Sequence, residues 1–587
     1  MSVHHMVQSN DIWFVTNWFD PKSNHNELYS TNISNDSKDD KDIVVYVDGY
    51  IVPRISVFEE YRNIPQENLI KIFYRKFGLD FIHYIKGVFV LIIFENNNFF
   101  IFNDRHSIKK YFIYEEANIF FISNSLRTIS DNFSFSLDRT NVAIFSLISH
   151  FLVGQTMFKN VTACRPAECV AFDSGRMKRF YYWHPRDIIK KRKIEKRTFS
   201  SYAWQWKQII NGYLVCLNPK GISLTLTGGN DSRMVLAALL SIKSKFHTFT
   251  FGNPHSYDGE IVQEIKNKAK IPHSYYVVEN PTSEWFRMRV KDILSFGNSL
   301  VNIHRAHRYE AVTTEKNSHP ETEILFTGLV GGEYLKEPAY NNITIPVLFK
   351  NLGTFRNETE CCGLIARMLQ EKGLDTSKID VQSVYKRLQA FLDHGKGLNE
   401  AEKKFVYTYL FYGCAHHTQD ANVFGHHIRY VVNPFMDIDF LELIAGYKKW
   451  YVNRKQRFFH KAFHSELLVG ITDNLAPELS VIPYAKKGKY TANDLLKKKG
   501  KYILKRLAGL ISRGGNSYPP NFPMGSWLYD FCDIQMAKLN KELLELYDLN
   551  MLKRELESVK KKSNEENWHI VTNPININLN YEYYQKI

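Results

Sequence analysis

The chain has 587 residues, of which 44% are hydrophobic, and a formal net charge of +15. This length predicts about two to four domains and allows each one a packed core. The longest apolar run, residues 88–94, has the length of a strand and excludes a membrane helix, which needs roughly 18 residues. The N-terminus has no basic segment followed by an apolar one, so we expect a cytoplasmic protein.

Neither the cysteines nor the charge identifies a binding partner. The seven cysteines show no CxxC spacing, which argues against a disulfide framework or a zinc site. The positive charge lies in runs at residues 190–197, 486–489, 497–505 and 560–562. Such an excess is compatible with nucleic acid, anionic lipid or an acidic substrate. We favour a compositional origin, because a chain rich in Lys, Asn and Ile is typical of an AT-rich genome.

Residues 1–190 are predicted to be mostly β-structure. Short apolar runs alternate with turn residues, which is typical of stacked antiparallel sheets. The expected strands are residues 43–47, 88–94, 99–102 and 119–122, and the expected turns are Asp48-Gly49, 95–98 and 115–118. The polar segment 22–41 is predicted to be a loop, and the basic stretch 190–197 a linker.

After this linker, strands alternate with helices, which predicts a parallel sheet with crossover helices. Strands are expected at residues 222–227, 246–251, 274–278 and 324–328, and helices at 232–240 and 258–270. Residues 385–480 are predicted to be mostly helical. Beyond residue 515 we expect a helical piece at 528–562, followed by a polar, Asn-rich tail.

The sharpest local feature lies between the first of these strands and its helix. It reads Leu226-Thr227-Gly228-Gly229-Asn230-Asp231-Ser232-Arg233. Glycines let backbone N–H groups approach an anion closely, and the helix N-terminus adds its positive dipole end. The hydroxyls of Thr227 and Ser232 and the carboxylate of Asp231 complete a predicted site for a phosphate with Mg²⁺. The spacing excludes a Walker loop.

This loop resembles the Ser-Gly-Gly-x-Asp-Ser pyrophosphate loop (PP-loop) of N-type ATP pyrophosphatases, with Thr227 in place of the first Ser. That superfamily includes asparagine synthetases, β-lactam synthetases, lasso-peptide cyclases, argininosuccinate synthetases and tRNA-modifying enzymes. The next strand and helix, with Asp258 and His273, are similar to the asparagine-synthetase unit. In that family the end of this strand contacts adenine, which implies such a role for Phe251 and Gly252.

Residues 326–333 resemble the family's Ser/Thr-Gly-x-Gly-x-Asp-Glu loop. This resemblance implies that Thr327 and Gly328 contact ATP and that the loop supplies a second Mg²⁺ ligand besides Asp231. Gly332 replaces the family's Asp, so Glu333 is left as that ligand. Leu329 stands where the family has Glu or Tyr, which points away from asparagine synthesis itself.

Two later segments complete the resemblance. Residues 483–489 resemble the element that brings a catalytic lysine to the triphosphate, and this implies a catalytic role for Lys486, with Lys487 as the alternative. Residues 432–437 resemble the family's Pro-Phe-Leu-Asp segment, which packs the C-terminal helices against the active site. This resemblance implies a structural role. Asp231 is the third residue to which the resemblance gives a catalytic role.

Four N-terminal segments, at residues 85–91, 103–112, 121–127 and 161–183, resemble the glutaminase domain of the same family. That domain has an Ntn-hydrolase sandwich fold and uses a Cys at position 2 as its nucleophile. Here position 2 is Ser2, and the first cysteine is Cys164. The glutamine-binding Asn-Gly-Glu element reads Asp48-Gly49-Tyr50. The resemblance therefore implies a degenerate domain without glutaminase activity.

The resemblance as a whole implies an α/β protein in three parts. These are a degenerate Ntn glutaminase-like β-sandwich with helices at 1–190, a parallel-sheet ATP pyrophosphatase domain at 198–515, and a C-terminal extension at 516–587. The implied activity is ATP-dependent, AMP-forming carbon–nitrogen ligation through an acyl-adenylate, with ATP and Mg²⁺. The carboxylate substrate, for which a precursor peptide is one candidate, and the amine or ammonia remain open.

Three alternatives stay open at this point. A ring-closing synthetase of the β-lactam or lasso type also lacks glutaminase activity. A catalytically degenerate ATP-binding homologue is favoured by Ser2, Leu329 and Gly332. A tRNA-modifying ATP pyrophosphatase is favoured by the positive charge, although such enzymes lack the N-terminal sandwich, so nucleic acid is an unexpected partner.

Overall fold

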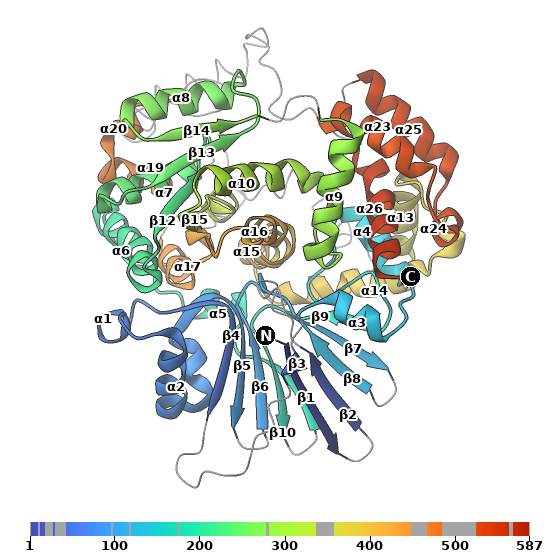
Figure 1. The fold of residues 1–587 in the computed structure, drawn as a ribbon, viewed down its shortest axis with the longest axis horizontal. Coiled ribbons are helices and arrows are strands. Elements are labelled where there is room, and N and C mark those ends of the chain that lie inside the picture. The colour runs from blue at the N-terminus through green and yellow to red at the C-terminus, as the bar shows by residue number, and fades with distance from the viewer. Residues whose placement is uncertain are drawn as a thin grey trace.

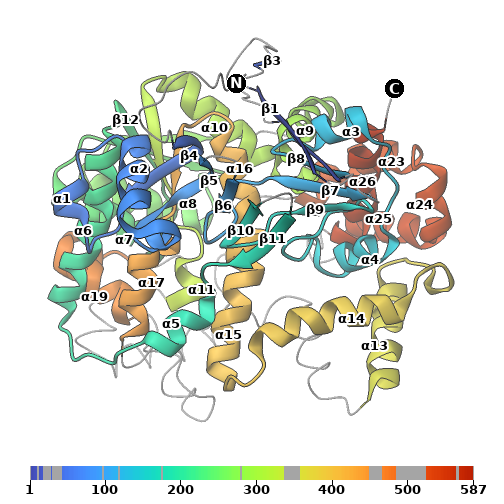
Figure 2. The same ribbon diagram turned by 90° about the horizontal axis from the view of Figure 1, so that it is seen from below.

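The computed structural model describes residues 2–9, 12–17, 28–29, 43–95, 98–116, 119–173, 176–277, 281–335, 357–447, 466–483, 524–562 and 568–585. Within these ranges the fold is mixed α/β, with two sheets in the N-terminal part and one parallel sheet after them (Figure 1). Figure 2 shows the last helices, α23 to α26, grouped at one end of the molecule, away from α6 and α19.

The N-terminal part contains two stacked sheets, of order β3-β1-β2-β8-β7-β9 and β11-β10-β6-β5-β4. The first comprises β1 Ser2–Ser9, β2 Ile12–Asn17, β3 Leu28–Tyr29, β7 Phe112–Glu116, β8 Ile119–Ser123 and β9 Val161–Ala163. The second comprises β4 Val44–Pro53, β5 Ile85–Glu95, β6 Asn98–Asn103, β10 Glu168–Asp173 and β11 Arg176–Tyr181. The strands on either side of the predicted turns at 95–98 and 115–118 pair antiparallel, β5 with β6 and β7 with β8, while residues 96–97 and 117–118 lie outside the described residues.

Helices cover the outer faces of both sheets. Ile113 on β7 packs between the sheets with Ile101 of β6, whereas its neighbour Phe112 faces the opposite side, as the alternation of side chains along a strand requires. On the outer faces lie α2 Gln66–Phe77, through Leu69 and Phe73, and the pair α3 Leu126–Asn132 and α4 Arg139–Ile148. The result is four layers, in the order helix, sheet, sheet, helix.

The prediction of a turn at Asp48-Gly49 is wrong, because β4 runs through both residues and pairs with β5 over its whole length. Two glycines allow this close backbone approach. A Cβ on Gly49 would lie 2.0 Å from the carbonyl oxygen of Val88, and one on Gly87 would lie 2.1 Å from that of Tyr50. Both have positive φ, 117° and 142°, which glycine alone adopts readily.

Two segments predicted to be irregular contain regular structure. Leu28–Tyr29, inside the predicted loop 22–41, forms β3, and the rest of that loop lies outside the described residues. The predicted linker 190–197 begins inside α5 Pro185–Lys191, and α6 Phe199–Leu217 follows it. A Pro at the first helical position and a capping box between His184 and Asp187 begin α5.

The predicted parallel sheet is confirmed, with the order β14-β13-β12-β15-β16. Its strands are β12 Gly221–Thr225, β13 His247–Phe251, β14 His273–Tyr276, β15 Thr322–Phe326 and β16 Tyr430–Val432. Between them run α7 Asn230–Ile242, α8 Tyr257–Ala269, α9 Ser283–Gly297, η2 Ile303–Arg305 and α10 Ala306–Ser318. The three-residue strand β16 was not predicted, since it interrupts a helical region and is defined by its pairing with β15.

The described residues of 357–447 and 466–483 are mostly helical, which confirms the prediction for 385–480 as far as that region is described. They contain α13 Glu358–Glu371, α14 Val381–Leu392, α15 Glu400–Thr408, η6 Tyr409–His416, α16 Thr418–Gly425, α17 Ile438–Ala445, α19 Glu466–Leu475 and α20 Pro477–Ser480. The segment η6 is wound as a π-helix. This conformation is rare in proteins, and where it occurs it is often at a functional site.

The C-terminal helices are α23 Met524–Met536, α24 Lys541–Leu546, α25 Leu549–Lys562 and α26 Trp568–Tyr584. The prediction of helix over 528–562 is confirmed, but that of a polar tail is wrong, because most of α26 is buried. Its asparagines bond groups of other elements. The Asn573 amide donates to Ser149 Oγ at 3.1 Å, and Asn576 Oδ1 accepts from the N–H of Ile303 at 3.0 Å.

Candidate functional site

The Gly-Gly loop lies at the carboxyl edge of the parallel sheet, between β12 and α7. Its own hydroxyls hold the turn. The Oγ atoms of Thr227 and Ser232 are 3.1 Å apart, and Ser232 Oγ also accepts from the N–H of Thr227 at 3.1 Å. Thr227 Oγ1 accepts from the N–H of Gly229 at 3.2 Å. The loop is therefore preorganised at the start of α7, where a helix N-terminus favours an anion.

One amide of this loop already binds an anionic oxygen. The N–H of Gly228 donates to a carboxylate oxygen of Asp258, in the first turn of α8, at 2.9 Å. Burial raises the pKa of Asp258, against the lowering effects of this bond and of Arg233. A phosphate oxygen would accept the same kind of hydrogen bond. The sequence motif contained Asp258, but this contact was not predicted.

A second loop, after β15, contacts the first at two points. The N–H of Gly332 donates to Asp231 Oδ2 at 2.9 Å. Gly328 lies so close to Ser232 that a Cβ on it would come within 2.5 Å of the Ser232 nitrogen. Glu333 follows Gly332 in α11 Gly331–Leu335. The two predicted metal ligands, Asp231 and Glu333, thus lie in the first turns of α7 and α11, which follow two loops that are in contact.

These carboxylates suit the predicted ion. Mg²⁺ takes oxygen ligands and is usually bound through one or two carboxylates together with substrate phosphates and water. Asp231 and Glu333 are such carboxylates, and they lie beside hydroxyls and amides suited to phosphate oxygens.

The second loop also carries strain and an unsatisfied hydroxyl. Val330 is buried and has φ of 55°, which is an outlier for a β-branched residue and costs roughly 1–3 kcal/mol. Thr327 is fully buried, and its Oγ1 has no hydrogen-bond partner among the described residues. Features of this kind cluster at functional sites.

Three further residues with a predicted ATP contact lie outside the Gly-Gly turn itself. They are Leu226, Phe251 and Gly252. Leu226 is a core side chain, and its carbonyl accepts from Thr250 Oγ1 at 2.6 Å. Phe251 ends β13, and its ring centroid lies 6.1 Å from that of His307. Gly252 has φ of 121° and donates its N–H to the Tyr276 carbonyl at 3.2 Å. Phe251 and Gly252 lie at the sheet edge that the resemblance gives to adenine.

The buried side chain of Arg233 braces the Gly-Gly loop from behind through backbone carbonyls. Its side chain is buried, and its guanidinium donates to the carbonyls of Gly228, Ile482 and Pro483 at 2.9, 2.9 and 3.0 Å. Arg233 thereby ties the Gly-Gly loop to the chain segment just before Lys486 and Lys487. These two predicted catalytic lysines lie outside the described residues.

Sequence reasoning missed an ionic cluster that involves η2, α10 and α16. Arg305 Nη1 lies 3.2 Å from Asp420 Oδ1, and Arg308 pairs with the other carboxylate oxygen of Asp420. His416 and His417 complete this group, which we call the arginine cluster. The pair Arg305 and Arg308, one helical turn apart, was the available signal, but its partners lie more than a hundred residues away in the sequence.

The positions that replace the glutaminase motif have other partners. Asp48 forms an ion pair with Lys109 at 3.0 Å. Tyr50 donates its hydroxyl hydrogen to the carbonyl of Val431, on β16, at 2.9 Å. Ser2 begins β1. Tyr50 therefore joins the N-terminal part to the parallel sheet.

A second ionic cluster, the boundary cluster, lies where these two parts meet. Lys86 Nζ contacts Asp437 at 2.7 Å and Asp439 at 2.8 Å, and Arg54 contacts Asp439 at 2.8 Å. Tyr213 donates its hydroxyl hydrogen to Asp437 at 2.7 Å. Asp437 closes the predicted Pro-Phe-Met-Asp segment, whose structural role this geometry explains.

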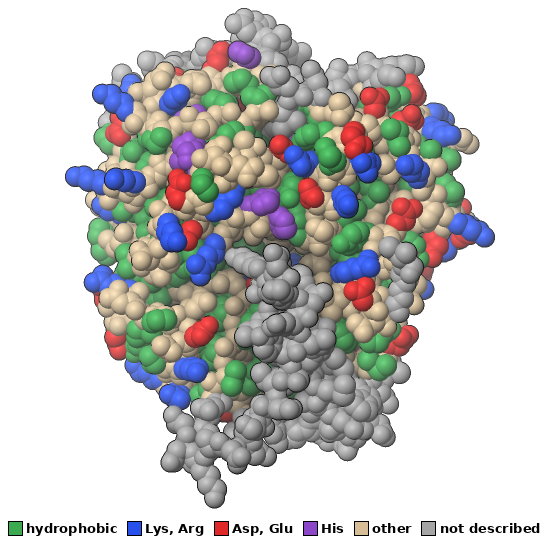
Figure 3. Space-filling view, in the orientation of Figure 1, with side chains coloured by type: hydrophobic (Ala, Val, Ile, Leu, Met, Phe, Trp, Pro, Cys, Tyr) green, Lys and Arg blue, Asp and Glu red, His purple; other side chains and the backbone are tan. Residues whose placement is uncertain are grey.

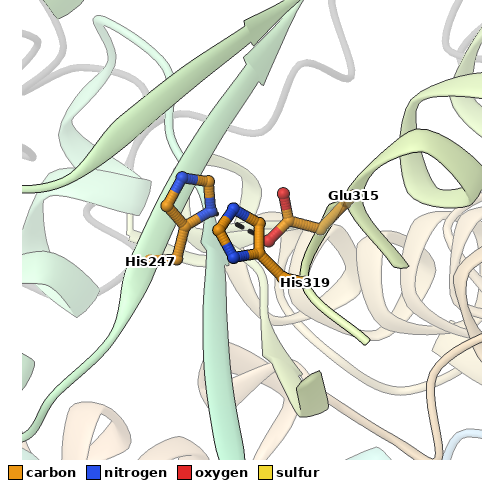
Figure 4. A group of neighbouring side chains, drawn as sticks. All are labelled: His247, Glu315 and His319. Carbon is orange, nitrogen blue, oxygen red and sulfur yellow. Dashed lines mark hydrogen bonds and ion pairs between the residues drawn. The ribbon is translucent and has the colours of Figure 1, made fainter. Parts of the chain in front are cut away.

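Within the described residues, one group of side chains has the composition of a metal site, at the amino edge of the sheet. His247, Glu315 and His319 have ligand atoms within 4.8 Å of one another. The two rings lie face to face, 3.8 Å between centroids (Figure 4), so their in-plane lone pairs do not converge on one ion. Glu315 instead bonds His247, Ser223 and Tyr276. We assign this group a structural role.

No model of a known protein family matches the chain, and a search of curated proteins finds no match. In the part of the chain that the structure describes, no helix has the length and apolarity to cross a membrane. On the face in Figure 3, Lys and Arg side chains are scattered among acidic ones and do not gather in one basic patch.

Proposed function

We propose that the protein is an ATP-dependent, AMP-forming ligase of the asparagine-synthetase type, which joins a carboxylate to an amine without glutaminase activity of its own. The contact between the two loops, Asp231 with Gly332 and Ser232 with Gly328, carries this proposal. In open α/β sheets, ligands bind outside the carboxyl ends of the strands.

In this proposal the pyrophosphate part of ATP binds the loop amides and displaces Asp258 from Gly228. Asp231 and Glu333 would hold Mg²⁺, which screens the phosphate charges. The substrate carboxylate attacks the α-phosphorus, which forms the acyl-adenylate and releases pyrophosphate. The amine then attacks the acyl carbon and releases AMP.

The N-terminal part would serve as a scaffold of Ntn-hydrolase type. Its helix–sheet–sheet–helix layering supports this interpretation. No cysteine precedes Cys164, which is fully buried, and burial raises the pKa of its thiol to about 11. A thiol with so high a pKa does not form the nucleophilic thiolate near neutral pH.

The direct test is ATP–pyrophosphate exchange with a panel of carboxylates that includes aspartate, glutamate and candidate peptides. We expect exchange to depend on one carboxylate and to fall at least about 100-fold in Asp231→Asn, because this change removes a metal-binding charge. Absence of both exchange and Mg·ATP binding in the wild type would contradict the proposal.

A glycine pair tests the contact between the loops. In Gly328→Ala the new Cβ would clash with the Ser232 nitrogen, so we expect ATP affinity to fall at least about tenfold, or 1.4 kcal/mol. The control is Gly363→Ala in α13, where a Cβ meets no atom within 4 Å. This control should leave ATP affinity unchanged. Equal affinity in the two variants would show that the loops do not form the site.

A catalytically degenerate ATP-binding homologue is the second candidate. The observation in its favour is Gly332, which has no carboxylate and whose N–H caps Asp231. Tight Mg·ATP binding without exchange across the carboxylate panel would favour it.

A further inference from the structure

A pocket lies between the N-terminal part and the segments η6 and α16. Its wall includes residues 150–155 and Lys110 of the N-terminal part, and Leu300, Cys414 and Thr418 of the later part. The centre of a water molecule can occupy about 30 Å³ of this pocket, and a single water needs about 10–15 Å³ on this measure. The pocket therefore has room for about two or three waters, or for one molecule of that size.

One wall of the pocket contains a buried acceptor that has no donor. His150 is 2% exposed, and its Nδ1 lies 3.0 Å from the carbonyl oxygen of Phe151. Because a carbonyl oxygen can only accept, Nδ1 carries the hydrogen and Nε2 is left as the acceptor. Burial lowers the pKa of His150 to about 4, against the raising effect of its bond to Phe151, so the ring is neutral near pH 7. Nε2 has no partner among the described residues.

A second acceptor belongs to the same wall, five residues further along the chain. The Oε1 atom of Gln155 is buried, and within the described ranges it also has no hydrogen-bond partner. Buried acceptors without donors are costly. Two of them around one pocket therefore indicate an occupant that supplies hydrogens.

The pocket also has a cation without an anionic partner. Lys110 is half-buried, and its Nζ donates to Ser107 Oγ at 2.8 Å. It forms no ion pair in the part of the chain that the structure describes. Asp104 does not serve as one, since its oxygens accept three backbone N–H groups, and burial raises its pKa to about 6 against the lowering effects of these bonds and of Lys110. An ammonium group has three hydrogens, so Lys110 can still bind an anion.

These three groups select the chemistry of the occupant. A carboxylate alone would compensate the charge of Lys110 but would offer no hydrogen to His150 and Gln155. An amine alone would supply hydrogens but would place a second positive charge beside Lys110. Water would satisfy the acceptors and leave the charge uncompensated. A molecule with one carboxylate and one ammonium group meets all of these requirements.

The remaining wall limits the size of this molecule. It is mostly apolar and comprises residues 151–153, Ala163, Leu300 and Ala415. In so small a space, an apolar wall tolerates at most a small apolar substituent.

We propose that this pocket binds a free α-amino acid of the smallest size, glycine or alanine. Lys110 would bind its carboxylate, and His150 and Gln155 would accept from its ammonium group. The inference does not rest on the proposed ligase function, because the described residues that line the pocket include none of the candidate ATP site. The wall comes from two parts of the chain, so the ligand would contact both.

Isothermal titration calorimetry with the nucleotide-free protein tests this inference. The probes are glycine and alanine. The comparators are acetate and methylamine, which each lack one charged group, and glycolate, which has a hydroxyl in place of the ammonium group. We expect glycine or alanine to bind at least about tenfold more tightly than every comparator. Valine and phenylalanine should bind at least about tenfold more weakly than the better probe, because overpacking of a small pocket is unfavourable.

Two variants remove the recognition groups separately. Lys110→Met removes the charge and should weaken binding of the better probe at least about tenfold. Gln155→Met removes one acceptor and should weaken it at least about threefold. The matched control is Lys159→Met, which changes an exposed lysine nearby in the sequence and should bind as the wild type does. Circular dichroism checks that each variant is folded. Equal affinities for amino acids and comparators in the wild type, or a preference that survives both variants, would overturn the inference.

Thermal unfolding gives an independent readout. A ligand that binds only the folded chain stabilises it, so the better probe should raise the Tm of the wild type and of Lys159→Met, but not that of Lys110→Met. An equal rise with acetate, or in Lys110→Met, would overturn the inference. Neither result bears on the ligase function, which ATP–pyrophosphate exchange tests separately.

Discussion

The boundary cluster and the arginine cluster are both buried, but they differ in balance. The boundary cluster sets Lys86 and Arg54 against three carboxylates, those of Asp437, Asp439 and the more exposed Glu442, so each of its cations has a carboxylate partner. The arginine cluster sets two cations against Asp420 alone. Buried charge is stable only when it is paired and hydrogen-bonded. The comparison indicates that the boundary cluster, whose cations pair with carboxylates of another part of the chain, fixes the architecture, whereas the arginine cluster has more cations than carboxylates.

The largest expected effect comes from removing the buried cation of the boundary cluster. Lys86→Met would leave Asp437 and Asp439 with less cationic partner charge. Because removal of one partner of a buried ion pair is strongly destabilising, we expect a loss of about 3–5 kcal/mol in the free energy of unfolding. Urea denaturation measures it, with the exposed Lys268→Met on α8 as control. A loss below about 1 kcal/mol would show that the cluster is dispensable.

Removal of a buried hydrogen-bond acceptor near the arginine cluster should have a smaller effect. Asn576→Ala would leave the N–H of Ile303 without its acceptor, at a cost of about 1–3 kcal/mol in the free energy of unfolding. Thermal unfolding measures this loss. The exposed Asn267→Ala on α8 is the control, and equal behaviour of the two variants would argue against a structural role of this bond.

The smallest expected effect is a change in the acid dependence of stability. Burial would raise the pKa of Asp439, but Lys86 and Arg54 outweigh it and lower this pKa far below its reference value of 3.8. The unfolded chain therefore binds more protons below about pH 4. Stability from this group is complete above that pH and is lost as the pH falls.

Asp439→Asn removes this titration. We expect the stability of the variant to fall less steeply with acid, by up to about 1.4 kcal/mol per pH unit. Urea midpoints between pH 5 and about pH 3 measure the slope. Parallel slopes in variant and wild type would mean that Asp439 does not titrate below its reference pKa.

Much of the fold was predictable because it depends on local patterns. The strands of the parallel sheet are short apolar runs, and the Gly-Gly turn marks the change from β12 to α7. The misses have non-local causes. Asp48-Gly49 is typical of a turn, but Gly87 on the partner strand lets the two backbones approach. The Asn-rich end of the chain appears solvent-exposed until Asn573 and Asn576 are seen to bond other elements.

The candidate site was predictable to a similar degree. Its two loops were identified from their sequence motifs. The structure brings Asp231, Ser232, Gly328 and Glu333 to the carboxyl edge of the parallel sheet. Two side chains of the motif, those of Leu226 and Arg233, are buried in the structure, which the motif letters did not indicate. The arginine cluster was not predictable, since Arg308 and Asp420 are 112 residues apart and their imbalance matters only because they are buried.

The docking of α26 on α4 sets an order for biosynthesis. Asn573 bonds the carbonyl of Phe145, which is 428 residues earlier in the chain. At translation rates of about 5–20 residues per second, roughly 20 to 90 seconds separate the synthesis of these two residues. During that interval the apolar surface of α4 lacks its final cover and is open to aggregation or to a chaperone. Helix α26 is among the last described residues to be synthesised. It therefore completes a surface of the N-terminal part, which is synthesised first.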